Sequence, residues 1–375
     1  MIYLDNSATT KAYKQVTDEY VKINEECFFN PSALYTAAID AEKTVENARK
    51  RVSLLMGKNR DNIYFTSGGT ESDNIAVLGA ALAYKKKGNH IITTTIEHKA
   101  VLKSCEFLQN LGFEVTYIGT DEYGVVDLEA LENAITDKTV LISVMLVNNE
   151  TGVIQPINKI KDLAGNIIVH TDAVQAFGKV SLKDINADLI SVSSHKIHGP
   201  KGVGALYISD DAKVTTTVLG GGQEKGIRSG TLNVPAISGF GIACEIADDN
   251  FESNREYLKN LRDYCAKLLV ENIDNVVING NSSPVNIISA SFEGVRGEVL
   301  LHTLETKEIY LSTGSACNSK NTKTSYVIDA LGLDRKYAEG TVRISLSVLN
   351  TKEEIDIAVN EIKNAVIFLR KFKRR

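Results

Sequence analysis

Lys196 and Asp172 are the residues of this 375-residue chain best placed to do chemistry. Asp172 follows the apolar run Ile167–Thr171, and an acid emerging from such a run needs a partner, such as a protonated ring nitrogen. Lys196 follows the run Leu189–Ser193. Desolvation at such a strand end lowers the pKa of an amine and suits it to imine formation with a carbonyl group.

A glycine turn and a histidine add two further parts. The turn Ser67-Gly68-Gly69-Thr70 follows Ile63–Thr66 and opens a helix-like segment, so its N–H groups form an anion cradle. Such turns are common, and a lone histidine such as His98 is more often structural than catalytic. With the lysine and the acid, however, they supply a phosphate cradle, an aromatic ring for stacking, an acid for a pyridinium nitrogen and an imine-forming amine. That is the set which pyridoxal 5'-phosphate (PLP) requires.

These residues follow short apolar runs that alternate with helix-like stretches between residues 60 and 210. The alternation predicts an α/β domain with a mostly parallel seven-stranded sheet and helices on both faces. In such a sheet, ligands bind outside the carboxyl ends of the strands. The predicted strands are Ile63–Thr66, Ile91–Ile96, Glu114–Ile118, Val140–Val147, Ile167–Thr171, Leu189–Ser193 and Val203–Ile208.

The pattern changes near residue 250. Amphipathic helices there flank short strands near Val276–Asn279, Asn286–Ser291 and Thr341–Leu346, which predicts a smaller α+β domain. We expect residues 16–250 to form the large domain, and residues 1–15 and 251–375 to form the small one.

Composition narrows the class of protein. A hydrophobic content of 43% and a charged content of 24% are those of a globular domain, and the net charge of −5 gives no reason to expect nucleic acid as the main partner. We expect no signal peptide and no membrane span, because the sequence has neither a charged leader nor eighteen consecutive apolar residues. The five cysteines are odd in number and form no C-x-x-C pair, so we expect neither a metal site nor disulfides, and a cytoplasmic location.

Cys317 differs from the other cysteines in its surroundings. It lies in Ser312-Thr313-Gly314-Ser315-Ala316-Cys317-Asn318-Ser319, where glycine and small polar residues predict a mobile loop. A residue that carries sulfur from one site to another needs such mobility.

Ten motifs extend the argument along nearly the whole chain, and several are long. They are YLDNSATT, NPSALY, FTSGGTESDN, EHKAVL, MLVNNETG, HTDAVQAFGK, SSHKIHGPKGVGALY, GGGQEKGIRSGTLNV, STGSACNS and VRISL. Through them the chain resembles the cysteine desulfurases of the NifS/IscS type, which belong to the class V aminotransferases among the fold-type I PLP enzymes.

The resemblance implies a role for each matching residue. Lys196 would hold PLP covalently, Asp172 would pair with its ring nitrogen, and His98 would stack on the ring. The remaining assignments are Gln175 at the ring hydroxyl, Asn149 near the ring, Gly69, Thr70, Ser193 and His195 at the phosphate, Thr231 at the phosphate of a neighbouring subunit, and Arg343 at the substrate carboxylate.

The implied reaction converts L-cysteine to L-alanine and leaves the sulfur on Cys317 as a persulfide, with His98 as a proton acceptor nearby. A homodimer is implied, as is a sulfur acceptor such as an iron–sulfur scaffold or a tRNA thiolation enzyme. Three departures from the family pattern leave the subfamily open, namely Tyr35, Thr324 and Ser347-Val348. Selenocysteine lyase or sulfinate desulfination, and a non-catalytic protein on this fold, remain as alternatives.

Overall fold

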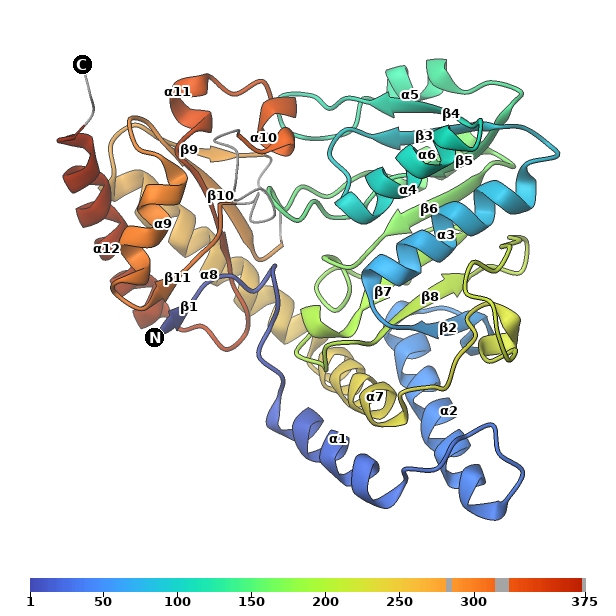
Figure 1. Ribbon diagram of the computed structural model, residues 1–375. Helices are drawn as coiled ribbons and strands as arrows, with labels where there is room; N and C mark the ends of the chain where they lie inside the picture. The colour runs from blue at the N-terminus through green and yellow to red at the C-terminus, as the bar shows by residue number, and fades with distance from the viewer. Residues whose placement is uncertain (281–284, 314–323, 373–375) are drawn as a thin grey trace.

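A seven-stranded sheet forms the centre of the computed structural model, which describes residues 1–280, 285–313 and 324–372 (Figure 1). The strand order is β2-β8-β7-β6-β5-β3-β4. All neighbours are parallel except the two pairs that involve β8, so the predicted fold class is confirmed. The strands are β2 (Ile63–Thr66), β3 (His90–Thr94), β4 (Glu114–Ile118), β5 (Thr139–Ser143), β6 (Ile168–Asp172), β7 (Leu189–Ser193) and β8 (Gly204–Ile208).

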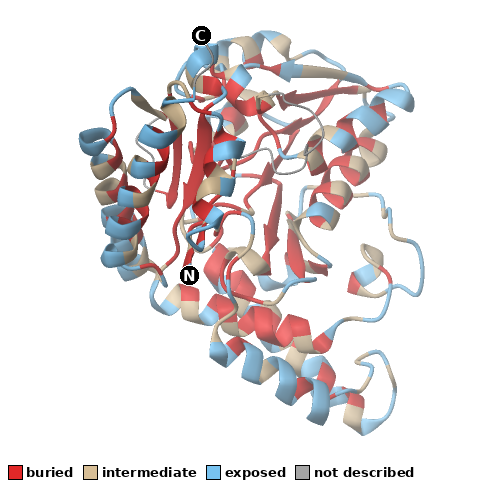
Figure 2. Cartoon of the chain, turned by 60° about the vertical axis from the view of Figure 1, so that its left-hand side comes forward, coloured by how far each residue is buried: buried red, intermediate tan, exposed pale blue. Residues whose placement is uncertain are grey.

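Alternating residues of these strands face two different cores. Ile91, Leu141 and Leu189 pack on one face, whereas their chain neighbours Ile92, Ile142 and Ile190 pack on the other. Because side chains alternate across a strand, a strand covered on both faces has to be apolar throughout. Figure 2 shows the strands buried and the outer faces of the helices exposed.

Helices cover both faces. The first face carries α3 (Gly69–Tyr84) and α4 (Lys99–Asn110). The second carries α1 (Lys14–Glu26), α2 (Thr36–Met56), α5 (Leu128–Ala134), α6 (Ile157–Ala164) and α7 (Val234–Asp249). Three short 3-10 helices are η1 (Arg60–Asn62), η2 (Ser194–Lys196) and η3 (Glu224–Gly226).

The fourth predicted strand is shorter than expected. Residues 140–147 were expected to pair throughout, but β5 ends at Ser143. The backbone of Leu146 still donates to Asp172 at 2.9 Å, and Asn148 N–H then donates to the Val153 carbonyl at 3.0 Å. The chain therefore leaves the sheet because the turn at 148–153 folds it back.

A second core lies among the N-terminal residues and the chain beyond residue 250. It joins Ile2 and Leu4 to apolar residues of 258–366. Its strands are β9 (Val276–Asn279), β10 (Ile287–Phe292) and β12 (Thr341–Ser345), antiparallel in the order β12-β10-β9, and the parallel pair β1 (Ile2–Tyr3) and β11 (Ile309–Tyr310). Its helices are α8 (Phe251–Asn272), α9 (Gly297–Glu305), α10 (Tyr326–Ala330), α11 (Arg335–Ala338) and α12 (Lys352–Arg370).

The N-terminal segment connects this second core to the end of β7. Asp5 bridges to Ser345 of β12. A few residues later, Thr10 N–H donates to the His195 carbonyl at 3.0 Å, and Tyr13 N–H donates to the His198 carbonyl at 3.0 Å. Residues 5–13 thus run as a strap beside Lys196. In the described ranges, no helix combines the length and the hydropathy needed to cross a membrane.

Candidate active site

A cavity of about 230 Å³ opens where β5, β6 and β7 end. This is the edge of the sheet where an α/β fold is expected to bind ligands. The cavity is lined by Gly69, Thr70, Asp73, His98, Met145, Asn149, Asp172, Val174, Gln175, Ser193, His195 and Lys196. Nine of these twelve residues are sequence-predicted site residues, which come from five separate segments of the chain.

Lys196 ends the 3-10 helix that follows β7, and the strap holds its amine. Lys196 Nζ donates to the carbonyl oxygens of Ser7 and Ala8, at 2.5 and 2.8 Å. Burial lowers the pKa of this amine to about 8, and the Arg343 guanidinium adds to the effect. A much larger fraction of the amine is therefore neutral near pH 7 to 8 than in an ordinary lysine, as a nucleophile requires.

Asp172 and His98 lie close together across the cavity. A ring nitrogen of His98 and a carboxylate oxygen of Asp172 lie within 4.8 Å of each other. Burial raises the pKa of Asp172, while His98, the Val174 N–H and Lys196 oppose the rise. The carboxylate accepts the Val174 N–H at 2.9 Å, which fixes its orientation at the end of β6.

His98 caps the N-terminus of α4. Its Nδ1 accepts the Ala100 N–H at 3.2 Å, so the hydrogen of the neutral ring lies on Nε2. Burial lowers the pKa of His98, which keeps the ring neutral at pH 7. For His98 to take up a proton at Nδ1, the bond from Ala100 would first have to open.

The end of the cavity formed by α3 suits a phosphate. The first N–H groups of a helix have no partner within the helix and favour an anion. Gly68 adopts a φ of 151°, a value that other residues rarely reach, and a Cβ atom on Gly69 would lie 2.7 Å from Val174. The backbone therefore approaches the cavity closely at this turn.

His195 lines the same cavity. Burial, aided by nearby lysines, lowers the pKa of His195 to about 4, so its ring is neutral.

Four buried polar atoms of the cavity lining have no hydrogen-bond partner among the described residues. They are Asp73 Oδ1, Asn149 Oδ1, Gln175 Oε1 and Ser193 Oγ. Buried polar atoms are rarely left unpaired, because each costs free energy until it is satisfied. The last three therefore point to a polar ligand, and a hydroxyl group and a phosphate are groups that would pair with them.

Arg343 lies on β12 at the rim of the site. Its Nη1 donates to the Asn149 carbonyl at 2.8 Å, and its Nη2 donates to the Asp5 carboxylate at 2.7 Å. The side chain is buried, and its Nε has no partner among the described residues. A guanidinium with one buried donor free can bind a carboxylate.

Two predicted site residues within the described ranges are absent from the cavity lining, namely Arg343, at the rim, and Thr231. Thr231 is exposed and lies between η3 and α7. Cys317 lies outside the described residues, and so does the loop predicted around it. On one side of that gap, the backbone of Ser312 exchanges hydrogen bonds with Arg343, and on the other, Tyr326 donates to the Glu97 carbonyl at 2.7 Å.

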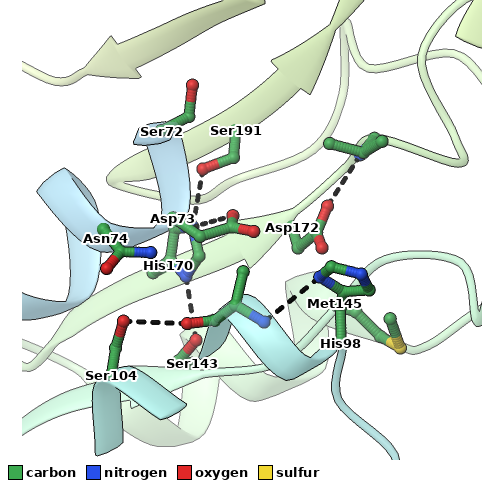
Figure 3. Close-up of polar contacts among 12 residues, drawn as sticks. Ser72, Asp73, Asn74, His98, Ser104, Ser143, Met145, His170, Asp172 and Ser191 are labelled. Carbon is green, nitrogen blue, oxygen red and sulfur yellow. Dashed lines mark hydrogen bonds and ion pairs between the residues drawn. The ribbon is translucent and has the colours of Figure 1, made fainter. Parts of the chain in front are cut away.

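Sequence reasoning missed four residues of the site. Asp73, Met145 and Val174 line the cavity, and Asp5 pairs with Arg343. Asp73 lies four residues after Gly69, so helical spacing could have placed both on the same face of α3. Figure 3 shows Asp73 with His98, Met145 and Asp172. Asp5 gave no such signal, because it is 338 residues from its partner.

Comparisons with known proteins agree with this geometry. Residues 2–357 match the family model described as aminotransferase class V. A cysteine desulfurase IscS from Clostridium botulinum is 45% identical over 97% of this chain and 94% of that protein, and one from Methanosarcina thermophila is 44% identical over 98% and 93%.

Solved structures give the same result. One described as a NifS-like protein has a TM-score of 0.91 and 38% identity, over 98% of this chain and 99% of that one. Another, described as SspA in complex with cysteine, has a TM-score of 0.82 and 34% identity, over 94% and 100%. With its sheet, its cavity and these full-length likenesses, the chain belongs to the class V aminotransferases and, within them, to the group of the cysteine desulfurases.

Proposed function

We propose that this protein is a PLP-dependent cysteine desulfurase, which converts L-cysteine to L-alanine and receives the sulfur on Cys317. The observation that carries the proposal is the cavity that Lys196, Asp172 and His98 line together, with its unpaired buried polar atoms. When bound, PLP supplies an electron sink for the bond changes at the substrate carbons.

Different residues of the cavity would bind different parts of the cofactor. Lys196 attaches it through the neutral amine that burial favours. Asp172 would hold a proton at the ring nitrogen, and Gln175 would contact the ring hydroxyl. His98 would stack on the ring, with Asn149 near it. Gly69, Thr70, Ser193 and His195 would hold the phosphate, near the N-terminus of α3.

Arg343 binds the substrate carboxylate. Its cationic fork is already fixed by Asp5 and the Asn149 carbonyl, so it reaches the substrate in a defined orientation. The amino acid would then lie near Lys196 as well, because the Arg343 charge is close enough to lower the pKa of the Lys196 amine.

Cys317 takes the sulfur. Its thiolate attacks the sulfur atom of the bound cysteine, and an S–S bond forms as the carbon–sulfur bond breaks. The carbon keeps the bonding electrons and takes a proton, which leaves alanine and a persulfide on Cys317. The thiol must first lose its own proton, and His98 can accept it only by releasing the Ala100 N–H.

Labelled cysteine tests the proposal directly. Purified protein loaded with PLP is incubated with ³⁵S-cysteine, alanine is quantified, and the labelled persulfide is mapped by mass spectrometry. We expect one alanine per sulfur transferred and label on Cys317. Lys196→Ala should abolish both products, whereas Lys213→Ala, at an exposed lysine outside the motifs, should not. Alanine formation that survives in Lys196→Ala would contradict the assignment, as would release of sulfite or selenide as the main activity.

We further propose a homodimer in which Thr231 completes the partner's phosphate site. Its exposure and its place in a glycine-rich segment support this arrangement. Sedimentation of an active monomer at assay concentration would contradict it. The sulfur acceptor is proposed to be a protein, either an iron–sulfur scaffold or a tRNA thiolation enzyme, and pull-down followed by persulfide transfer would identify it.

The domain division and the location are proposals as well. The second core supports a small domain of residues 1–15 and 251–375 beside a large domain of 16–250. A cytoplasmic location fits a reaction that depends on a free thiol, because that compartment keeps thiols reduced.

A further inference from the structure

A second carboxyl group lies beside Asp172, and the proposed reaction does not use it. Asp73 projects from α3 into the same cavity lining and is 1% exposed. An oxygen of Asp73, an oxygen of Asp172 and a ring nitrogen of His98 all lie within 4.8 Å of one another. Two buried carboxylates this close cannot both ionise without strong repulsion.

The partners of Asp73 carry no positive charge. His170 Nε2 approaches Asp73 Oδ1 at 3.6 Å, which is too long for a hydrogen bond. His170 is fully buried and burial lowers its pKa to about 3, so the ring is neutral and the contact is no ion pair. Among the described residues, Asp73 Oδ1 has no hydrogen-bond partner, and the neutral Ser191 hydroxyl is the neighbour that opposes the rise in the pKa of this carboxyl group.

The side chains around Asp73 form their hydrogen bonds in the neutral state. His170 contacts Ser143 Oγ at 2.8 Å through Nδ1 and Ser191 Oγ at 3.0 Å through Nε2 (Figure 3). A neutral imidazole donates at one nitrogen and accepts at the other, as these two hydroxyls allow. A protonated Asp73 beside this neutral chain of hydrogen bonds adds no charge to the core.

Asp172 has what Asp73 lacks. It accepts the Val174 N–H, and the charge of the Lys196 amine favours its ionised form. The remaining acid near the pair is Glu97, whose pKa burial raises to about 8, so it is mostly neutral at pH 7. Burial and the charge of Asp172 raise the pKa of Asp73 well above its ordinary value.

We infer that Asp73 carries a proton in the folded protein and so leaves Asp172 as the single ionised carboxylate beside the cofactor ring. Asp73 is thus a positioning residue, which acts through Asp172 and not on the substrate. The inference rests on the proposed function, in which Asp172 faces the ring nitrogen of PLP. The proton on Asp73 is nevertheless a property of the protein itself and can be measured apart from turnover.

Infrared spectroscopy of the PLP-loaded protein tests the inference, because a protonated carboxyl group has a C=O stretch distinct from that of a carboxylate. At pH 7, wild type is compared with Asp73→Asn, Asp172→Asn and Glu97→Gln. We expect Asp73→Asn to lose a protonated-carboxyl band and Asp172→Asn to lose none. Glu97→Gln serves as the matched control, since it should remove a different band. Loss of the band in Asp172→Asn and its persistence in Asp73→Asn would overturn the assignment.

Wild-type protein labelled with ¹³C-aspartate provides a version of the test that needs no variant. A protonated-carboxyl band that shifts on labelling belongs to an aspartate, and the described aspartates that are buried are Asp73, Asp172 and Asp188. Asp188 pairs with Lys161 at 2.7 Å and is therefore ionised. The absence of any label-sensitive band would show that Asp73 is ionised and refute the inference.

The titration of the cofactor absorption band adds an electrostatic readout. If Asp73 is neutral, Asp73→Asn removes no charge, and the midpoint of the titration stays within experimental error of wild type. An ionised Asp73 would instead give a shift of about one pH unit or more, because a charge is removed within roughly 4–6 Å. If the protonated-carboxyl band of Asp73 is present but the protein does not turn over cysteine, this inference stands and the proposed function is refuted. If cysteine turns over normally but the band is absent, the proposed function stands and this inference is refuted.

Discussion

Replacing Arg343 by alanine is expected to weaken L-cysteine binding by about 10- to 100-fold while leaving PLP binding nearly unchanged. The guanidinium is buried, and two of its nitrogens already donate to Asp5 and to the Asn149 carbonyl. Its Nε is unpaired among the described residues and is free for the substrate carboxylate. A hydrogen bond to a charged group contributes about 1.5–3 kcal/mol, and about 1.4 kcal/mol corresponds to a factor of ten in affinity.

The matched ligand is cysteamine, which is cysteine without its carboxylate. Dissociation constants for both compounds are measured on PLP-loaded wild type and Arg343→Ala, from the change in the cofactor absorption. Wild type should bind cysteine about 10- to 100-fold more tightly than cysteamine, and Arg343→Ala should bind the two compounds about equally. The preference of Arg343→Lys for cysteine should lie between these two values, because an ammonium keeps the charge but not the planar fork.

Asp5→Asn is the control for indirect effects, because Arg343→Ala also leaves the Asp5 carboxylate without its partner. The asparagine keeps an acceptor for Nη2 and leaves Arg343 cationic, so the preference for cysteine should largely persist. If Arg343→Ala weakens cysteine and cysteamine by the same factor, or if PLP affinity falls as much as cysteine affinity, Arg343 does not bind the substrate carboxylate.

Three further predictions follow from other parts of the structure. Attachment of PLP to the cofactor-free protein should accelerate as the pH rises from 7 to 9, with a midpoint near the Lys196 pKa of about 8, because the neutral amine is the nucleophile; a stopped-flow midpoint near 10.5 would contradict the burial argument. Cys317→Ser should bind PLP and cysteine but transfer no sulfur, whereas Cys105→Ser should keep turnover, since burial raises the pKa of the Cys105 thiol to about 12; persulfide mapped to Cys105 would reject this. Arg49→Ala should destabilise the fold by about 3–5 kcal/mol in urea unfolding, because it leaves the buried Glu224 carboxylate without its two 2.8 Å bonds; a loss below about 1 kcal/mol would show that the pair is dispensable.

The sequence determined the large sheet and much of the site. Strands buried on both faces must be apolar nearly throughout, so runs such as Leu189–Ser193 were found with their bounds intact. Parallel strands end at a common edge, and for that reason Asp172 and Lys196 could be expected near each other before any coordinates were known. The family motifs then gave expected roles to Gly69, Thr70, His98, Asn149, Gln175, Ser193 and His195, but not to Asp73, Met145 or Val174.

Only the tertiary structure placed the groups whose partners lie far along the chain. The strap carbonyls of Ser7 and Ala8 that hold Lys196 are nearly 190 residues from it, and the carboxylate of Asp5 is 338 residues from Arg343. No local pattern encodes such pairs, because they arise where two separately packed cores meet. The electrostatics of the site also depended on the folded chain, since a carboxyl group such as Asp73 changes its pKa through burial and through the charges packed against it, which no spacing in the sequence reveals.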